Sequence, residues 1–287
     1  MGLRVRVETL PPMKFAICNE TFVDWPFEKA CAFASKCGYT GLEVAPFTLA
    51  EYAHQVSAQK RSELRKIAED AGLEIIGLHW LLAKTEGFYL TTPDAGIRAA
   101  TSEYLCELAR LCRDLGGHLM VLGSPKQRNL LPGVSHHEAM RHAADTIQRA
   151  VPTLEACGVT IALEPLGPEE GDFLRTADLG ADLMRMIGSD RVRLHLDVKA
   201  MSTEEIPVCD VIRNHAGSMA HFHANDPNRR GPGMGTVDFK PIFQTLESVQ
   251  YKGWVSVEVF DYTPGPEYLA AESFSYMQEC LRAIAAH

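Results

Sequence analysis

The chain has 287 residues, of which 46% are hydrophobic and 23% charged, and its formal net charge is −9. This composition provides for a large apolar core and shows no bias toward disorder. The 28 lysines and arginines are dispersed along the chain, which excludes a basic surface for a nucleic-acid backbone, so we expect a globular protein without a nucleic-acid partner.

Targeting signals are not evident. The N-terminal segment MGLRVRVETLPPMKF lacks the apolar stretch of a signal peptide, and no segment approaches the ~18 consecutive apolar residues of a membrane span. The eight cysteines include no CxxC pair, and most have apolar neighbours, as small buried hydrophobic side chains do. We therefore expect neither export nor membrane insertion, and a cytoplasmic location.

Apolar runs rich in β-branched residues alternate along the chain with segments of 3.6-residue periodicity. The predicted strands are Lys14–Cys18, Gly41–Ala45, Glu74–Leu78, His118–Leu122, Thr160–Glu164, Arg193–Asp197, Ala220–His223 and Val255–Val259. The predicted helices are Pro26–Cys37, Ala58–Ala71, Ala99–Leu115, Glu138–Cys157, Leu179–Ile187 and Pro241–Ser248. Several of them end at a glycine just before the next strand, which is a typical helix stop.

Repetition of helix, glycine and apolar strand is typical of βα units, and eight units of about 36 residues suit a closed (β/α)8 TIM barrel. We expect one α/β domain over residues 1–287. The main alternative, an open doubly wound sheet, requires a glycine-rich phosphate turn after its first strand, where residues 19–22 read NETF. The long loops 81–98, 123–137 and 226–238 all follow predicted strands, on the face where barrels carry active sites.

Residues that bind metals well stand at the ends of the last four predicted strands: Glu164, Asp197, His223 and Glu258. Taken singly, a carboxylate at a strand end is more often a solvated or ion-paired surface group. Neighbouring strands of a barrel bring their ends together, however, and clustered acids repel one another unless a cation lies between them. Three carboxylates and one imidazole suit Mn²⁺ or Mg²⁺ and, less readily, Zn²⁺ or Co²⁺.

Other polar side chains share the inward face of these strands. His195 and His221 each precede one of the predicted ligands by two residues, so we expect them to pack one layer deeper or to support the ligands. The same interpretation covers Glu43, on the second strand. His79, at the end of the third strand, is better placed to line a substrate pocket, and Trp80 would stack on a sugar ring or pack in the core.

The order, spacing and context of the four predicted ligands closely resemble the sugar isomerase/epimerase family with a xylose-isomerase-like barrel, especially the ketose 3-epimerases. Glu164, Asp197, His223 and Glu258 are separated by 33, 26 and 35 residues, and the resemblance covers nearly the whole chain. It implies that Mn²⁺ is the usual metal, with Mg²⁺ or Co²⁺ as substitutes. It also implies that the two glutamates act both as ligands and as acid and base on opposite faces of the substrate.

The resemblance extends to two substrate-binding positions, Glu170 in EPLGPEEGDF and Arg229 in HANDPNRR. One position departs from it. The epimerases usually carry a histidine three residues beyond the aspartate ligand, where this chain has Ala200. Lys199 would supply a positive group there, or remain solvated. Abasic-site endonucleases share this barrel, but they gather three metals with extra histidines, one of them at position 200, and bind DNA; both requirements fail here.

We predict a divalent-metal-dependent isomerase or epimerase that acts on a keto sugar or related polyol ketone by proton transfer through an enediolate. Glu164 and Glu258 would be its base and acid. Two alternatives stay open: a lyase or dehydratase that eliminates from a 3-keto sugar or inosose, and a non-catalytic, metal-containing subunit. Which sugar binds, whether it carries phosphate, and whether the chain forms the homo-oligomers frequent among such barrels are not decided by the sequence.

Overall fold

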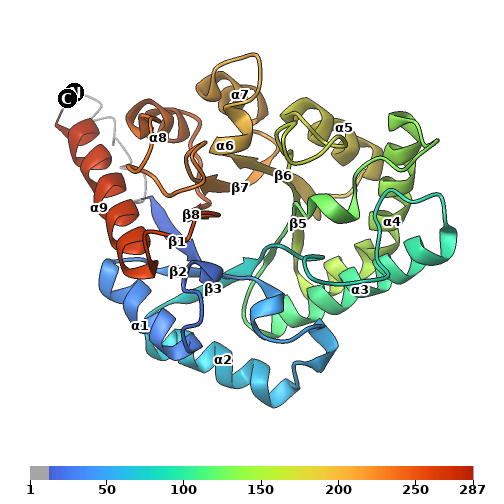
Figure 1. The fold of residues 1–287 in the computed structure, drawn as a ribbon, viewed down its shortest axis with the longest axis horizontal. Helices are drawn as coiled ribbons and strands as arrows, with labels where there is room; N and C mark the ends of the chain where they lie inside the picture. Colours follow the sequence, from blue (N-terminus) through green and yellow to red (C-terminus); the bar gives the residue numbers. More distant parts are fainter. Residues whose placement is uncertain (1–12, 287) are drawn as a thin grey trace, which may run out of the picture.

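Eight parallel strands close into a barrel in the computed structural model, which describes residues 13–286 (Figure 1). The strands are β1 (Lys14–Cys18), β2 (Gly41–Val44), β3 (Glu74–Leu78), β4 (Leu119–Leu122), β5 (Thr160–Leu163), β6 (Val192–Asp197), β7 (Met219–Ala224) and β8 (Trp254–Val257). Neighbouring strands pair in chain order, and β8 pairs with β1. The predicted (β/α)8 barrel is confirmed, and every predicted strand overlaps an observed one.

Helices form a ring outside the strands (Figure 1). They are α1 (Phe27–Cys37), α2 (Ala58–Asp70), α3 (Ala95–Asp114), α4 (His136–Cys157), α5 (Ala177–Ile187), α6 (Val198–Met201), α7 (Val208–His215), α8 (Phe239–Ser248) and α9 (Pro266–Ala285). Short 3-10 turns, η1 (Asn19–Thr21), η2 (Pro46–Thr48), η3 (Ala53–Gln55) and η4 (Pro125–Gln127), follow β1, β2 and β4 or precede α2.

Side-chain caps set where two of the helices begin. Asp94 accepts hydrogen bonds from two backbone N–H groups of the first turn, so α3 begins four residues earlier than predicted. Ser135 and Glu138 form a capping box, so α4 begins at His136 rather than at Glu138. Both caps satisfy N–H groups that have no partner inside the first helical turn.

Three of the observed helices were not predicted from the sequence. α6 has four residues and α7 has eight, too few for a clear periodic pattern. α9 is longer, and it packs against α1 and α8, which closes the helical ring (Figure 1). Its apolar positions Leu269, Ala270 and Met277 are fully buried. The helical periodicity of apolar residues is therefore present in this segment, although no helix was predicted there.

The strand register stacks polar side chains in two layers inside the barrel. Asp197 pairs with His223 across β6 and β7, and His195 pairs with His221 one layer below. Because side chains two residues apart point to the same face of a strand, all four point inward, and all four are buried. The predicted deeper layer is therefore observed, while the main apolar core lies between the strands and the helices.

Among residues 13–286, no helix combines the length and the apolar composition needed to cross a membrane. The prediction that the N-terminus carries no export signal rests on residues 1–15, of which 1–12 lie outside the described part. Those residues and residue 287 also belong to the predicted domain, and for them that assignment stays a prediction.

Candidate active site and metal centre

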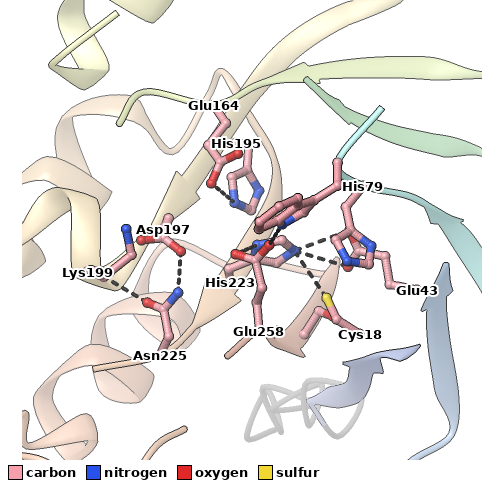
Figure 2. A network of polar contacts seen from close by, with 12 residues as sticks. Cys18, Glu43, His79, Glu164, His195, Asp197, Lys199, His223, Asn225 and Glu258 are labelled. Carbon is pink, nitrogen blue, oxygen red and sulfur yellow. Dashed lines mark hydrogen bonds and ion pairs between the residues drawn. The ribbon is translucent and has the colours of Figure 1, made fainter. Parts of the chain in front are cut away.

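The C-terminal ends of β5 to β8 bring the four predicted metal ligands together. Asp197 is the last residue of β6 and His223 lies near the end of β7, whereas Glu164 and Glu258 directly follow β5 and β8. None of the four is more than 6% exposed. Figure 2 shows their side chains pointing toward a common region at the mouth of the barrel.

Distances define two overlapping groups of donors. Ligand atoms of Glu164, Asp197 and His223, together with a nitrogen of His195, lie within 4.8 Å of one another. Glu258 adjoins this group, because its Oε2 lies 3.0 Å from Nδ1 of His223. The structure thus brings all four predicted ligands together, three of them in one compact group, and adds His195 beside them.

Glu43 supports His223 from below. Its carboxylate lies 3.1 Å from Nε2 of His223 and 2.8 Å from Nε2 of His221. Burial would raise the pKa of Glu43, but the two imidazoles lower it well below its ordinary value. An ionised acceptor at Nε2 favours a proton there and directs Nδ1 toward Glu258, the arrangement that fixes the orientation of histidine ligands in metal sites. His221 and Glu43 are thus packed and hydrogen-bonded inside the barrel, as expected, while their support of a metal ligand stays a prediction.

His195 has a different environment. Among residues 13–286, no protein group forms a hydrogen bond with either of its ring nitrogens. Oε1 of Glu164 is 3.9 Å from its Nε2. Burial and the neighbouring imidazole of His223 lower the pKa of His195 well below its ordinary value, so it is a neutral ring beside the acids.

Asn225 fixes Asp197 and was missed in the sequence. Its Nδ2 donates to Oδ2 of Asp197 at 2.5 Å, and its Oδ1 accepts from the backbone N–H of Lys199 at 2.9 Å (Figure 2). The other carboxylate oxygen of Asp197 accepts from the N–H of Ala200 at 2.8 Å. Asn225 lies two residues after His223. Because side chains two residues apart on a strand point to the same face, this spacing could have placed Asn225 in the site from the sequence.

Glu164 packs tightly against the end of β4. A Cβ at Gly123 would lie 1.5 Å from Oε2 of Glu164, so a larger residue there would displace this carboxylate. Burial raises the pKa of Glu164 well above its ordinary value, and the charges of Glu258 and Asp197 raise it further. Buried Arg128 opposes this effect only in part.

The two predicted acid–base residues therefore have opposite pKa shifts. Burial would raise the pKa of Glu258, but His223 and a hydrogen bond from Trp80 lower it below its ordinary value. Burial also raises the pKa of Asp197, as the charge of Glu258 does, against the opposing charge of Lys199. Buried carboxylates whose charge the protein does not offset are the environment that a divalent cation fits, and the donor set suits an oxygen-preferring metal.

Three of the four predicted substrate-binding residues line one cavity. Glu170, Lys199 and Arg229 border a space of about 340 Å³ beside the ends of β5 to β7, together with Ala200. The Nζ atom of Lys199 is paired with Glu170 and lies 4.8 Å from the ring centroid of Phe260. Ala200, three residues after Asp197, lines this cavity with a methyl group, where a larger side chain would take up space.

Comparison with known proteins agrees with this geometry. Residues 31–280 match the family model of the xylose isomerase-like TIM barrel. The chain belongs to this family. It is 31% identical over 171 residues to an L-ribulose 3-epimerase of Mesorhizobium japonicum, a match that covers 60% of this chain and 58% of that protein. It is 27% identical over 273 residues to a D-psicose 3-epimerase of Enterocloster bolteae, which covers 90% and 86%.

Among solved structures, the D-psicose 3-epimerase with D-tagatose from Clostridium cellulolyticum H10 has the same fold. The TM-score is 0.82 with 21% sequence identity, over 94% of this chain and 99% of that chain. The family assignment thus rests on sequence and fold together, while the roles of individual residues rest on the geometry described above.

In this xylose isomerase-like barrel, His79 lies below the rim. It is fully buried, and its Nε2 lies 2.6 Å from Oε2 of Glu20. Its predicted contact with substrate stays a prediction. Glu20, which was missed, lies in η1, two residues after the end of β1, and atoms of Cys18, Glu20, His79 and Glu258 lie within 4.8 Å of one another. Its place just after a strand was the available signal.

Proposed function

We propose that this protein is a divalent-metal-dependent isomerase or epimerase of a keto sugar, specifically a ketose 3-epimerase. The observation that carries the proposal is the convergence of two buried glutamates, Glu164 and Glu258, on Asp197 and His223 at the ends of β5 to β8. The sugar epimerases among its relatives support the same class of reaction.

Glu164, Asp197, His223 and Glu258 would hold the metal, which we propose to be Mn²⁺, with Mg²⁺, Co²⁺ and Zn²⁺ as alternatives. A divalent cation supplies positive charge that stabilises an oxyanion developing on the substrate. Four buried donors around one region support this assignment.

Proton transfer falls to the two glutamates. Glu164 and Glu258 would flank the reacting carbon as base and acid, so that one removes the proton next to the carbonyl and the other returns one. The substrate would pass through an enediolate. Return of the proton to the opposite face inverts the carbon, whereas return to the neighbouring carbon interconverts an aldose and a ketose.

Substrate binding would fall to the polar cavity. Lys199 and Arg229 offer donors, and Glu170 offers an acceptor, on one side of the metal ligands. Because Lys199 adjoins the space at Ala200, it would provide the positive group where relatives usually carry a histidine. His79 would act through Glu20 and contact substrate only if that pair opens.

The lyase or dehydratase remains the second candidate, because Ala200 leaves one oxygen of the substrate without the usual histidine. Incubation of the Mn²⁺-loaded protein in D₂O with D-psicose, D-fructose or L-ribulose, and in parallel with an inosose, separates the two. Deuterium at carbon 3 with formation of the epimer supports the epimerase. An enone product supports the lyase, and absence of both supports a non-catalytic subunit.

Variants make this experiment specific to the site. Glu258→Gln and Glu164→Gln should each slow deuterium exchange by about 100-fold or more, whereas Glu74→Gln, at an exposed strand position, should not. Exchange that survives a strong chelator would contradict the proposed metal dependence.

We further propose a cytoplasmic location. All eight cysteines lie in the described part of the chain and are unpaired, as is usual in a reducing compartment. A homo-oligomer stays a prediction.

A further inference from the structure

A second cavity opens across the barrel mouth from the one that Lys199 lines. It has a volume of about 600 Å³ and lies beyond the ends of β1 to β3. Six aromatic side chains line it: Phe22, Trp25, Phe27, Phe47, Trp80 and Tyr262. Cavities of this size and lining hold ligands larger than a single monosaccharide and prefer apolar, ring-shaped groups.

One polar group on the wall of this cavity lacks a partner. Glu20 borders the cavity and is only 6% exposed. Its Oε2 is occupied by His79 at 2.6 Å, but its Oε1 has no hydrogen-bond partner in the described part of the chain. A buried carboxylate oxygen without a hydrogen-bond donor destabilises the protein. A ligand in the cavity that donates a hydroxyl hydrogen bond to Oε1 would remove this cost.

The aromatic cavity adjoins the proposed acid–base site directly. Trp80, on its wall, donates to Oε1 of Glu258 at 2.8 Å. An oxygen of Glu20 lies within 4.8 Å of an oxygen of Glu258. One molecule can therefore occupy both the reacting position and the cavity.

An aromatic wall also connects the two cavities. The ring centroids of Phe47 and Trp80 are 6.0 Å apart, and those of Trp80 and Phe260 are 6.0 Å apart. Lys199 stands over the far side of this wall, 4.8 Å from the centroid of Phe260. The sugar would occupy the polar side near Lys199, which leaves the aromatic side for a group attached to the sugar.

We propose that the natural substrate is a keto sugar carrying an aromatic aglycone, which binds in the aromatic cavity while Glu20 accepts a hydrogen bond from a hydroxyl of the ligand. This inference rests on the proposed function for the sugar half of the site. It extends the substrate class from free ketoses to aryl glycosides that keep a free ketone on a ring carbon, because a ketone locked in the glycosidic bond could not form the enediolate.

Calorimetric titration of the Mn²⁺-loaded protein tests it with three glucosides that lack a ketone and cannot react. Phenyl β-D-glucopyranoside should bind about 10-fold more tightly than methyl β-D-glucopyranoside, because ring contacts contribute about 0.5–1.5 kcal/mol each. Cellobiose, which offers a second sugar ring, should bind more weakly than the phenyl glucoside. Equal affinities for the methyl and phenyl compounds, or tightest binding of cellobiose, would overturn the aromatic assignment.

Two variants locate the effect. Phe47→Ala, at a partly exposed position, should abolish the preference for phenyl over methyl. Glu20→Gln should weaken 4-hydroxyphenyl β-D-glucopyranoside more than the phenyl compound. Tyr268→Ala, which removes an aromatic ring that is 55% exposed on α9, should leave both preferences unchanged. Retention of the phenyl preference in Phe47→Ala would contradict the proposal.

Deuterium exchange into a free ketose separates failure of this inference from failure of the proposed function. Exchange without any aryl preference would keep the epimerase and remove the aglycone site. An aryl preference without exchange into any ketose would keep the binding site and remove the epimerase.

Discussion

The indole of Trp80 donates a hydrogen bond from Nε1 to Oε1 of Glu258 at 2.8 Å. The bond links the third strand to the eighth across the barrel mouth, and it contributes, after His223, to the lowered pKa of Glu258. The backbone of Trp80 has a φ of 53°, in the left-handed region that bulky residues rarely adopt. Contacts with Phe47 and Phe260 hold the ring in place.

Trp80→Phe tests whether this bond keeps Glu258 in its basic form. The variant retains an aromatic ring but loses the donor, so kcat should fall by about 10- to 100-fold, as expected for a lost hydrogen bond to a charged group. The pKa of Glu258 should rise, which moves the acidic limb of the pH profile of kcat/KM to higher pH. Trp25→Phe, in the same cavity, is the control, and an unmoved acidic limb in Trp80→Phe would contradict the assignment.

Lys199→Met tests the positive group next to Ala200. Lys199 is paired with Glu170, and both line the cavity beside the ends of β5 to β7. If it binds the substrate, kcat/KM for a ketose should fall by about 10- to 100-fold, since charged hydrogen bonds contribute about 1.5–3 kcal/mol. Lys240→Met, at an exposed position of α8, should change nothing. Equal kinetics in the two variants would show that Lys199 is merely a solvated ion-pair partner.

The barrel and the positions of its rim ligands were predictable because both depend on local patterns. Short apolar runs that end at Asp197 and His223 are visible in the sequence. In a closed parallel barrel the C-terminal ends of all strands lie on the same face, so these residues must lie close together. The first residues of α3 and α4 were missed because side-chain caps, rather than apolar periodicity, determine where these helices begin.

The supporting residues of the site were harder to predict because their roles depend on contacts between distant strands. Glu43 bonds to His223 across 180 residues, and Glu20 bonds to His79 across 59. No local pattern distinguishes such carboxylates from ordinary inward-facing or loop residues. Asn225 was closer to detection, because it shares the inward face that ends at His223.

Glu43→Gln should weaken both the fold and the metal site. The substitution keeps the shape but removes a buried charge shared by two imidazoles, which should lower the free energy of unfolding by about 3 kcal/mol. It also releases Nε2 of His223 from its acceptor, so metal affinity should fall by about 10- to 100-fold. Urea unfolding and competitive metal titration measure the two effects. Glu74→Gln, exposed on β3, is the control, and unchanged metal affinity in Glu43→Gln would remove Glu43 from its supporting role.

Metal removal should have a larger effect at higher pH. The pKa values of Glu164 and Asp197 are raised in the folded, metal-free chain. Their contribution to stability is therefore fully present below the unfolded-state pKa and is lost as pH rises through the folded value. Metal binding requires the deprotonated carboxylates and reverses this loss.

The thermal midpoint should accordingly rise more on addition of Mn²⁺ at about pH 8 than at about pH 5. Comparing midpoints with Mn²⁺ and with a chelator at each pH cancels most of the contribution from Glu43, whose lowered pKa acts in the opposite direction. Glu164→Gln removes the carboxylate whose pKa is raised most strongly among the proposed ligands. The Mn²⁺-induced shift of the thermal midpoint should then depend less on pH. A Mn²⁺ effect that is the same at both pH values would mean that no buried carboxylate with a raised pKa takes part in holding the ion.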